Sequence, residues 1–320
     1  MAGAEATTST TGERRGAGRG DEAAGRSGAW FPRWYWPSFT VPGTAWLLVL
    51  FVLPFYTVMS VAFGTVDPLF RTPLPVYQPW WWSFDTFGET LRKFYAGDAI
   101  YQEPLLRTFL YVISASLLCL VIGYAVAYYT ARYAGRFRIV ILITLVAPFF
   151  ISYLMRIYAW QSLLQPDGYI NDVWGLVGDP VTWLAGRPVT VILGLVYGYI
   201  PFMILPLYGS LDRIDQSMLE AGRDLGAGPW QTFRRVTLPM SKPAILAGLV
   251  IVSLPMFGDY YTNDLLGSER TSMLGNVIDD AVSQSGRGPE AGSLTIVLML
   301  IVVIPMIYYL RETRRAAGHA

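Results

Sequence analysis

One polar segment of the chain reads Glu220-Ala221-Gly222-Arg223-Asp224-Leu225-Gly226 and is followed by Val236-Thr237-Leu238-Pro239. It lies between two long apolar runs, so we expect a loop beside a membrane and not part of a core. Asp215 is a candidate N-cap for a helix over 216–225, Gly226 suits a left-handed helix terminus, and Pro229 suits the start of a second helix. The segment therefore predicts two short helices joined by a tight turn.

The composition indicates a membrane protein. Hydrophobic residues make up 53% of the 320 residues and charged residues 15%, whereas about a quarter of a soluble domain is charged. The mean hydropathy is +0.38. A spanning helix needs roughly twenty apolar residues, and six runs qualify, at about 43–63, 105–130, 138–163, 188–209, 243–263 and 291–311. Prolines inside these runs are tolerated in membrane helices, where neighbouring groups satisfy the freed backbone.

These runs predict an all-α polytopic membrane protein with six transmembrane helices. Residues 1–28 are rich in Gly, Ala, Ser, Thr and Arg and are expected to be disordered. The aromatic and basic segment 30–37 suits the headgroup layer, with partner binding as the alternative. The expected parts are a cytoplasmic tail with its interfacial segment at 1–42, a membrane domain at 43–311 with a polar loop at about 210–242, and a second cytoplasmic tail at 312–320.

Basic residues set the expected orientation, because cytoplasmic loops carry an excess of Lys and Arg. Sixteen basic residues fall on one side if both termini lie on that side, and seven fall in the longer loops opposite. Both termini and the Glu220 loop are therefore predicted to be cytoplasmic, in a multi-pass membrane protein.

The spacing of the polar segment resembles the coupling loop of the membrane subunits of ABC importers. The shared pattern is Glu-Ala-small, three residues, Gly, nine residues, an aliphatic residue, one residue and Leu-Pro. An ordinary amphipathic cytoplasmic loop is the alternative. The resemblance implies the type I permease fold and a loop that docks onto a separate ATPase through Glu220, Ala221, Gly222, Asp224, Gly226, Leu238 and Pro239. Gly222 departs from the pattern, where a second Ala is usual, and weakens the helix by about 1 kcal/mol.

Other stretches resemble the spermidine/putrescine-type permeases. They are Phe150–Trp160, Gly168–Asn171, Gly194–Tyr197, Pro201–Met203, Leu254–Pro255, Gly258–Tyr261, Asp264–Gly267 and Leu274–Asn276. The resemblance implies a second related permease, two ATPase subunits and an extracellular solute-binding protein as partners. The outer loop 64–104, with Trp80–Trp82, would be a docking surface for that protein, or else an aromatic belt with a surface helix over 84–94. Similar permeases also carry other small organic solutes.

The chain itself is not expected to catalyse a reaction or to bind a cofactor. A P-loop needs Gly-Lys before Ser or Thr, and the two lysines, Lys93 and Lys242, follow Arg and Ser. ATP and Mg would therefore bind the partner ATPase. One cysteine, Cys119, and one histidine, His319, argue against a metal site. No nucleic-acid partner is expected. An ion-coupled secondary transporter and a membrane-bound enzyme are the competing classes, and the chain lacks the clustered catalytic groups that an enzyme would need.

Ionisable residues inside predicted spans are candidates for the translocation pathway. Arg156 lies in the outer part of the third predicted span, where an unpaired charge costs about 2.5–3.5 kcal/mol. Asp259 lies at a similar predicted depth in the fifth, so the two residues are expected to pair, as a structural link or on the pathway. A polycation needs carboxylates and aromatic faces. The pathway candidates are Arg156, Tyr158, Asp259, Tyr260, Tyr261 and Asp264.

Overall fold

A computed structural model describes the backbone of residues 35–96, 99–176 and 178–317, with side chains from residue 38 to residue 311. The tail expected to be disordered over 1–28, most of the aromatic segment 30–37 and the end of the tail 312–320 lie outside the described residues. The chain forms two compact units, Met1–Tyr56 and Thr57–Ala320, and each is described by itself.

The first unit contains most of helix α1, which spans Tyr35–Ala62. The helix begins well before the expected start at residue 43. Its stretch Ser38–Ala62 is a candidate membrane span with a mean hydropathy of 2.1. Residues 44–53 are almost all apolar, so the helix is apolar around its circumference, as a lipid-embedded helix is. Pro42 and Pro54 lie inside it, as expected of a membrane helix.

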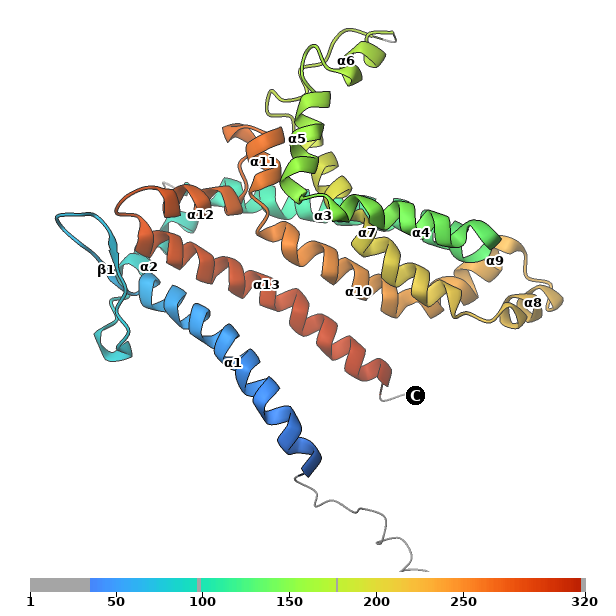
Figure 1. Ribbon diagram of the computed structural model, residues 1–320, viewed down its shortest axis with the longest axis horizontal. Helices are drawn as coiled ribbons and strands as arrows, with labels where there is room; N and C mark the ends of the chain where they lie inside the picture. The colour runs from blue at the N-terminus through green and yellow to red at the C-terminus, as the bar shows by residue number, and fades with distance from the viewer. Residues whose placement is uncertain (1–34, 97–98, 177, 318–320) are drawn as a thin grey trace, which may run out of the picture. The chain divides into compact units, whose positions relative to one another are not determined.

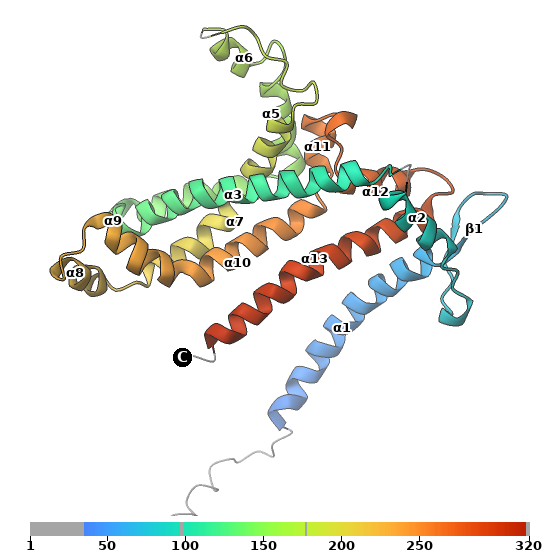
Figure 2. The ribbon, with the colours of Figure 1, turned by 180° about the vertical axis from the view of Figure 1, so that it is seen from behind.

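The second unit is built on long helices that run side by side. They are α3 (Gln102–Arg132), α7 (Pro188–Asp212), α10 (Leu238–Phe257) and α13 (Gly288–Ala317). Helices α3, α7 and α10 pack against one another (Figures 1 and 2). Figures 1 and 2 also show that α8 (Gln216–Asp224) and α9 (Pro229–Thr232) lie at one end of these helices, far from α11 (Tyr261–Leu266) and α12 (Leu274–Ser283).

Met203 of α7 marks the seam of the three packed helices and is fully buried. A Cβ atom at Gly123 of α3 would lie 3.1 Å from Met203 Cγ, and one at Gly248 of α10 would lie 2.6 Å from Met203 Sδ. Small residues let membrane helices approach closely, because lipid offers no hydrophobic drive for association. The two glycines therefore allow α3 and α10 to close on α7 from either side.

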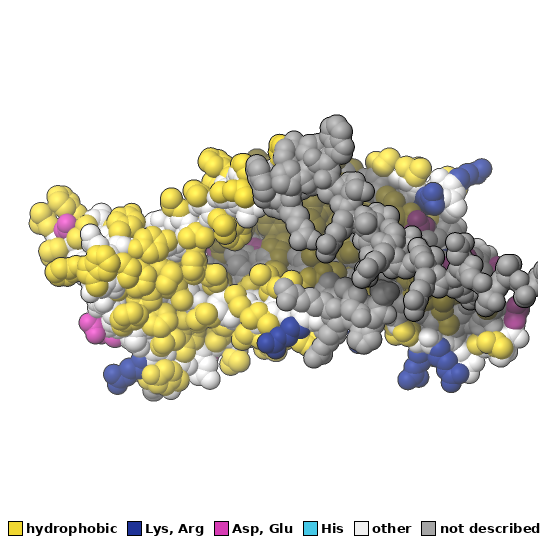
Figure 3. Space-filling model, turned by 90° about the horizontal axis from the view of Figure 1, so that it is seen from below, with side chains coloured by type: hydrophobic (Ala, Val, Ile, Leu, Met, Phe, Trp, Pro, Cys, Tyr) yellow, Lys and Arg dark blue, Asp and Glu magenta, His cyan; other side chains and the backbone are white. Residues whose placement is uncertain are grey.

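The outer surface of α3 carries an apolar stripe. Its members recur at helical spacing and are all exposed; they are Leu106, Leu110, Ile113, Leu117 and Val121. On the face shown in Figure 3, hydrophobic side chains cover most of the described surface. Such a surface would be a liability in water and suits a bilayer or a partner helix.

The third predicted span, over 138–163, is not one helix. The chain forms η3 (Gly135–Phe137), α4 (Arg138–Val146), η4 (Ala147–Phe150) and α5 (Tyr153–Leu163). Gly135–Phe150 and Tyr153–Leu163 meet at a bend of 94°. Pro148 has no N–H for the helical ladder, the Ile151 N–H donates to the Pro148 carbonyl at 3.1 Å, and Ile151 is extended. The described residues thus contain five candidate spans, or six if the bent pair counts as one.

The fifth predicted span, over 243–263, is shifted. Helix α9 continues through a π-helical turn, η5 (Phe233–Thr237), into α10, so that Pro229–Phe257 is one helical stretch. It ends before Gly258, and Asp259 lies between α10 and α11. The prediction that one helix runs over 243–263 and carries Asp259 was therefore wrong. The Asp259 side chain accepts the Thr262 N–H at 3.0 Å, which favours a new helix start over continuation of α10.

Short elements complete the second unit. Strands β1 (Thr65–Val66) and β2 (Pro73–Leu74) pair antiparallel. The remaining elements are η2 (Pro79–Trp81), α2 (Asp85–Tyr95), α6 (Tyr169–Trp174) and η6 (Glu269–Thr271). Helix α2 confirms that the stretch 84–94 is helical, and the choice between a docking surface and an aromatic belt for the loop 64–104 stays a prediction.

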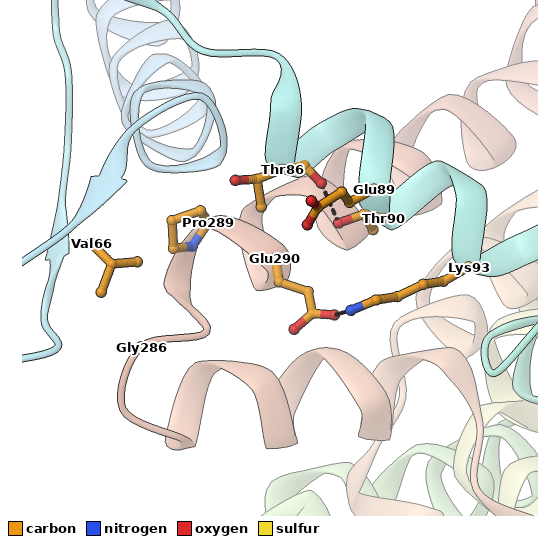
Figure 4. A pocket seen from close by; sticks show the side chains of 8 residues that line it. All are labelled: Val66, Thr86, Glu89, Thr90, Lys93, Gly286, Pro289 and Glu290. Carbon is orange, nitrogen blue, oxygen red and sulfur yellow. Dashed lines mark hydrogen bonds and ion pairs between the residues drawn. The ribbon is translucent and has the colours of Figure 1, made fainter. Parts of the chain in front are cut away.

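Glu290, at the start of α13, ties three elements together. It forms ion pairs with Lys93 of α2 at 2.5 Å and with Arg287 at 2.7 Å, and it accepts a hydrogen bond from Tyr101, just before α3. Burial raises the pKa of Tyr101 to about 12, and the hydrogen bond to Glu290 adds to the shift. Figure 4 shows Lys93 and Glu290 meeting across the pocket between α2 and the start of α13.

We expect Glu290→Gln to lower the free energy of unfolding by about 1–3 kcal/mol, because the hydrogen bonds that it weakens are charge-assisted. Chemical unfolding of the detergent-solubilised chain measures this. Glu103→Gln is the matched control, since the Glu103 side chain is 75% exposed in its pair with Arg107 and such pairs contribute about 0.5 kcal/mol. Equal losses in both variants would contradict the assigned role of Glu290.

Candidate functional site

The polar loop folds as two short helices and a turn, as predicted. Asp215 caps α8 by accepting the Ser217 N–H at 3.0 Å, and hydrogen bonds from the backbone hold the pKa of this carboxyl below its usual value. Gly226 has a φ of +82°, in the left-handed region that glycine adopts without steric cost. Its N–H donates to the Arg223 carbonyl at 2.8 Å. Helix α9 then begins at Pro229.

The predicted docking residues of α8 face outward. Glu220, Ala221 and Asp224 are exposed, and the side chain of Leu225 is 89% exposed. Glu220 Oε1 accepts a hydrogen bond from Gln216 at 3.0 Å, and Glu220 belongs to none of the ion pairs among the described residues. The charge of Glu220 is therefore available to a partner.

The inner side of α8 packs on the second helix of the loop. A Cβ atom at Gly222 would meet Thr232 Cγ2 at 3.6 Å, an ordinary contact, so an alanine would also fit there. Leu238 and Pro239 lie at the start of α10, and both are exposed. The structure thus places the Glu-Ala-Gly part of the predicted motif on α8 and its Leu-Pro part on the helical stretch Pro229–Phe257 that follows.

Asp259 is the centre of a buried polar cluster that joins α5, α7 and α11. Its side chain is almost fully buried. Asp259 Oδ2 accepts hydrogen bonds from the hydroxyls of Tyr153 at 2.7 Å, Tyr199 at 3.1 Å and Thr262 at 2.7 Å. A Cβ atom at Gly198 of α7 would lie 2.7 Å from the Tyr153 ring, so the glycine makes room for this ring. Together with the Thr262 N–H on Oδ1, four donors satisfy this carboxylate.

Arg156 lies beside this cluster but is not paired with Asp259. It is 8% exposed, and its Nε atom has no hydrogen-bond partner among the described residues. Its guanidinium lies 4.7 Å from the ring centre of Phe149 and 5.5 Å from that of Tyr153, distances at which aromatic faces attract cations. The expected direct ion pair is absent from the described pairs. Tyr153 stands between the charges, with its ring toward Arg156 and its hydroxyl on Asp259.

The other pathway candidates form a second, more exposed group. The rings of Tyr260 and Tyr261 lie 4.0 Å apart. Asp264 of α11 is exposed and accepts a hydrogen bond from Asn276 of α12 at 2.5 Å. Partial burial raises the pKa of Asp264, and the nearby carboxylates of α12 add to the shift. Tyr158 of α5 is 49% exposed, and no described side-chain contact joins it to either group.

Tyr153, Tyr199, Thr262 and Gly198 were not singled out from the sequence. Tyr153 stands within a stretch used only for family resemblance, and Tyr199 lies in an apolar run. A Thr three residues after an Asp is a local signal for a helix start, and it was available at Asp259 and Thr262. The contact of Tyr153 with Asp259, 106 residues apart, has no local signal.

Comparison with known families gives one match that covers most of the membrane part. The family model described as binding-protein-dependent transport system inner membrane component matches residues 108–314. That range begins inside α3 and ends three residues before the end of α13, and it includes the polar loop and the Asp259 cluster.

Among curated proteins, the chain is similar to the spermidine/putrescine transport system permease protein PotB of several bacteria. It is 33% identical to PotB of Escherichia coli (strain K12) over 272 residues. The aligned residues make up 84% of this chain and 94% of that protein. PotB of Haemophilus influenzae is 31% identical over 273 residues, covering 84% of this chain and 91% of the relative.

Among solved structures, the chain resembles a subunit of a bacterial alginate ABC transporter in complex with an alginate pentasaccharide-bound periplasmic protein. The TM-score is 0.69 at 19% identity, over 88% of this chain and 95% of the other. A chain of the MetNI methionine ABC transporter in an inward-facing conformation gives a TM-score of 0.51 at 18% identity, over 67% of this chain and 95% of the other. These likenesses show the fold.

We expect Tyr153→Phe and Asp259→Asn to be coupled, because each removes one side of the same buried hydrogen bond. In a double-mutant cycle of unfolding free energies their interaction should be about 1–3 kcal/mol. Arg156→Gln with Asp259→Asn is the matched cycle and should be closer to additive, since these side chains do not form an ion pair. A larger coupling for Arg156 than for Tyr153 would reverse the assignment.

Proposed function

The chain belongs to the family of binding-protein-dependent transport system inner membrane components, and we propose that it is the membrane-spanning permease subunit of an ATP-driven ABC importer of spermidine or putrescine. The observation that carries the proposal is the similarity to PotB, which extends over 84% of the chain and includes the α8 loop. The chain is a transport subunit and not the motor.

The partners are then a second related permease, two ATPase subunits, an extracellular solute-binding protein and the lipid bilayer. ATP and Mg bind the ATPase subunits. In this assembly the chain crosses the inner membrane six times, with the bent pair α4–α5 counted as one crossing, and both termini face the cytoplasm. The excess of basic residues on that side supports this orientation.

Helix α8 is proposed to receive the movement of the ATPase. On its exposed side, Glu220 and Asp224 offer charged contacts, and Ala221 and the C-cap residue Leu225 offer apolar ones. The inner face of α8 packs on α9, and α9 continues without a break through η5 and α10 to Phe257. Asp259 follows directly and is hydrogen-bonded to α5 and α7. One helix thus connects the docking surface with the buried polar cluster.

The solute path is proposed to pass the exposed group on α11. Two adjoining tyrosine rings and a carboxylate suit a chain of ammonium groups, since aromatic faces and anions both attract cations. Tyr260, Tyr261 and Asp264 supply these features, whereas Asp259 is already saturated by its own hydrogen bonds. Arg156 would repel a polycation and is assigned to the helix packing beside Tyr153. Another small organic solute is the alternative within the same family.

We expect Glu220→Ala and Gly226→Val each to abolish polyamine uptake while the chain remains in the membrane. Glu220 supplies the charged contact, and a β-branched residue at a φ of +82° would force the turn to change. Uptake of labelled spermidine by cells measures the effect. Gly228→Val is the matched control, because Gly228 has a φ of −65°, open space around a Cβ and a following proline. Normal uptake in both test variants would contradict the role of α8.

We expect a cysteine at position 224 to be labelled only from the cytoplasm and a cysteine at position 280 only from outside, in a Cys119→Ala background. Both native residues, Asp224 and Asp280, are exposed, so impermeant maleimide should reach them in intact cells or in inverted vesicles. Labelling of both positions from one side would contradict the proposed orientation.

Uptake also separates the importer from an ion-coupled transporter. In proteoliposomes the complete assembly should require ATP and the binding protein, and the chain alone should move no solute down an ion gradient. Gradient-driven uptake by the chain alone would favour the other class.

A further inference from the structure

The helical stretch that leads into and includes α10 is longer than the hydrocarbon layer is thick. The helical stretch Pro229–Phe257 has 29 residues, or about 43 Å at the rise of an α-helix, whereas the hydrocarbon core is about 30 Å thick. The twenty residues of α10, Leu238–Phe257, match that thickness by themselves. With α10 across the hydrocarbon and the α8 loop on the cytoplasmic side, as the proposed function has them, residues 229–237 fall at the level of the headgroups.

Two sides of this protruding segment are already covered by protein. Thr232 and Val236 face α8, since both approach the Cβ position of Gly222 within 4.0 Å. Phe233 packs edge-on against Tyr124 and Tyr128 of α3. The remaining side has no protein against it among the described residues.

That side forms a groove of about 530 Å³, lined by Trp230, Gln231, Arg234 and Arg235. These residues recur at positions i, i+1, i+4 and i+5 and so share one helix face. Trp230 is 70% exposed, and its ring is held by stacking on Phe233 at 5.4 Å. The rigid indole and the two flexible arginines therefore border one open site.

The charge of the groove is uncompensated. Arg234 and Arg235 are exposed, and neither belongs to an ion pair within the described part of the chain. A guanidinium presents a planar fork of donors that matches a phosphate. Tryptophan side chains favour the headgroup layer. The segment also contains the π-helical turn η5, a feature that is frequent at functional sites.

We infer that the groove of Trp230, Gln231, Arg234 and Arg235 binds the phosphate headgroup of an anionic phospholipid of the cytoplasmic leaflet. The two arginines hold the phosphate, and the Trp230 ring lies beside the glycerol region. A lipid bound there fixes the start of α10 at one depth in the membrane, and with it the height at which α8 meets the ATPase. The level of the groove and its charge favour a lipid over a protein surface.

The test uses the full-length chain purified in detergent with its partner subunits and stripped of lipid. Its unfolding midpoint is followed against the concentration of a short-chain phosphatidylglycerol, with phosphatidylcholine of the same chain length and inorganic phosphate as comparison ligands. Wild-type protein should be stabilised by phosphatidylglycerol alone. Arg234→Gln with Arg235→Gln should weaken the apparent Kd by about thirtyfold, as expected for two basic groups near an anionic headgroup.

The matched control removes the same charge elsewhere. Arg92 and Arg270 are exposed, outside the groove and likewise without a described ion pair, so Arg92→Gln with Arg270→Gln should keep the wild-type Kd. An unchanged Kd in the Arg234/Arg235 variant would overturn the inference. So would equal stabilisation by inorganic phosphate, which would indicate a free anion. Loss of the ATPase subunit from the Arg234/Arg235 variant at every lipid concentration would assign the groove to that protein instead.

Discussion

The hydrogen bonds to Asp259 are the constraint on which the arrangement of the second unit depends. A buried carboxylate is costly unless its oxygens are satisfied, and here Tyr153, Tyr199 and Thr262 supply donors from α5, α7 and α11. The carboxylate cannot leave this position without exposing a charge or losing several bonds. Asp259 lies two residues after the end of α10, so its hydrogen bonds fasten that end to these three helices.

Features with short-range causes could be predicted from the sequence. The polar loop is the clearest case, because Asp215, Gly226 and Pro229 act on backbone groups within three residues of themselves. Their identities alone therefore predicted the N-cap of α8, the left-handed turn and the start of α9. The long apolar runs likewise predicted both ends of α3 and α7 and the start of α13 to within about three residues, since length and hydropathy are what a bilayer requires. The charged end of α13, up to Ala317, lies beyond the apolar run and was not predicted.

Features with long-range causes could not be predicted in the same way. Hydropathy is the same for a straight span and a bent one, so the 94° bend before Tyr153 left no mark in the hydropathy of the run 138–163. Pro148 was a local signal, but membrane helices tolerate proline, so its presence alone did not predict the bend. The pairing of Arg156 with Asp259 was argued from equal depth along two straight helices. The bend at Ile151 and Ser152 and the end of α10 at Phe257 removed both premises, and a tyrosine took the place expected for the arginine.

The exposed side of α8 shows why this chain is incomplete by itself. Leu225 has 89% of its surface exposed beside the charged Glu220 and Asp224, a combination that is unfavourable in water unless a partner covers the apolar part. The cap at Asp215 and the left-handed turn at Gly226 hold this surface in one conformation before any partner binds, which lowers the entropic cost of docking. The same helix pair is fixed to α10 through Gly222 and Thr232. The docking surface and Asp259 are therefore joined by packed helices and not by a loop alone.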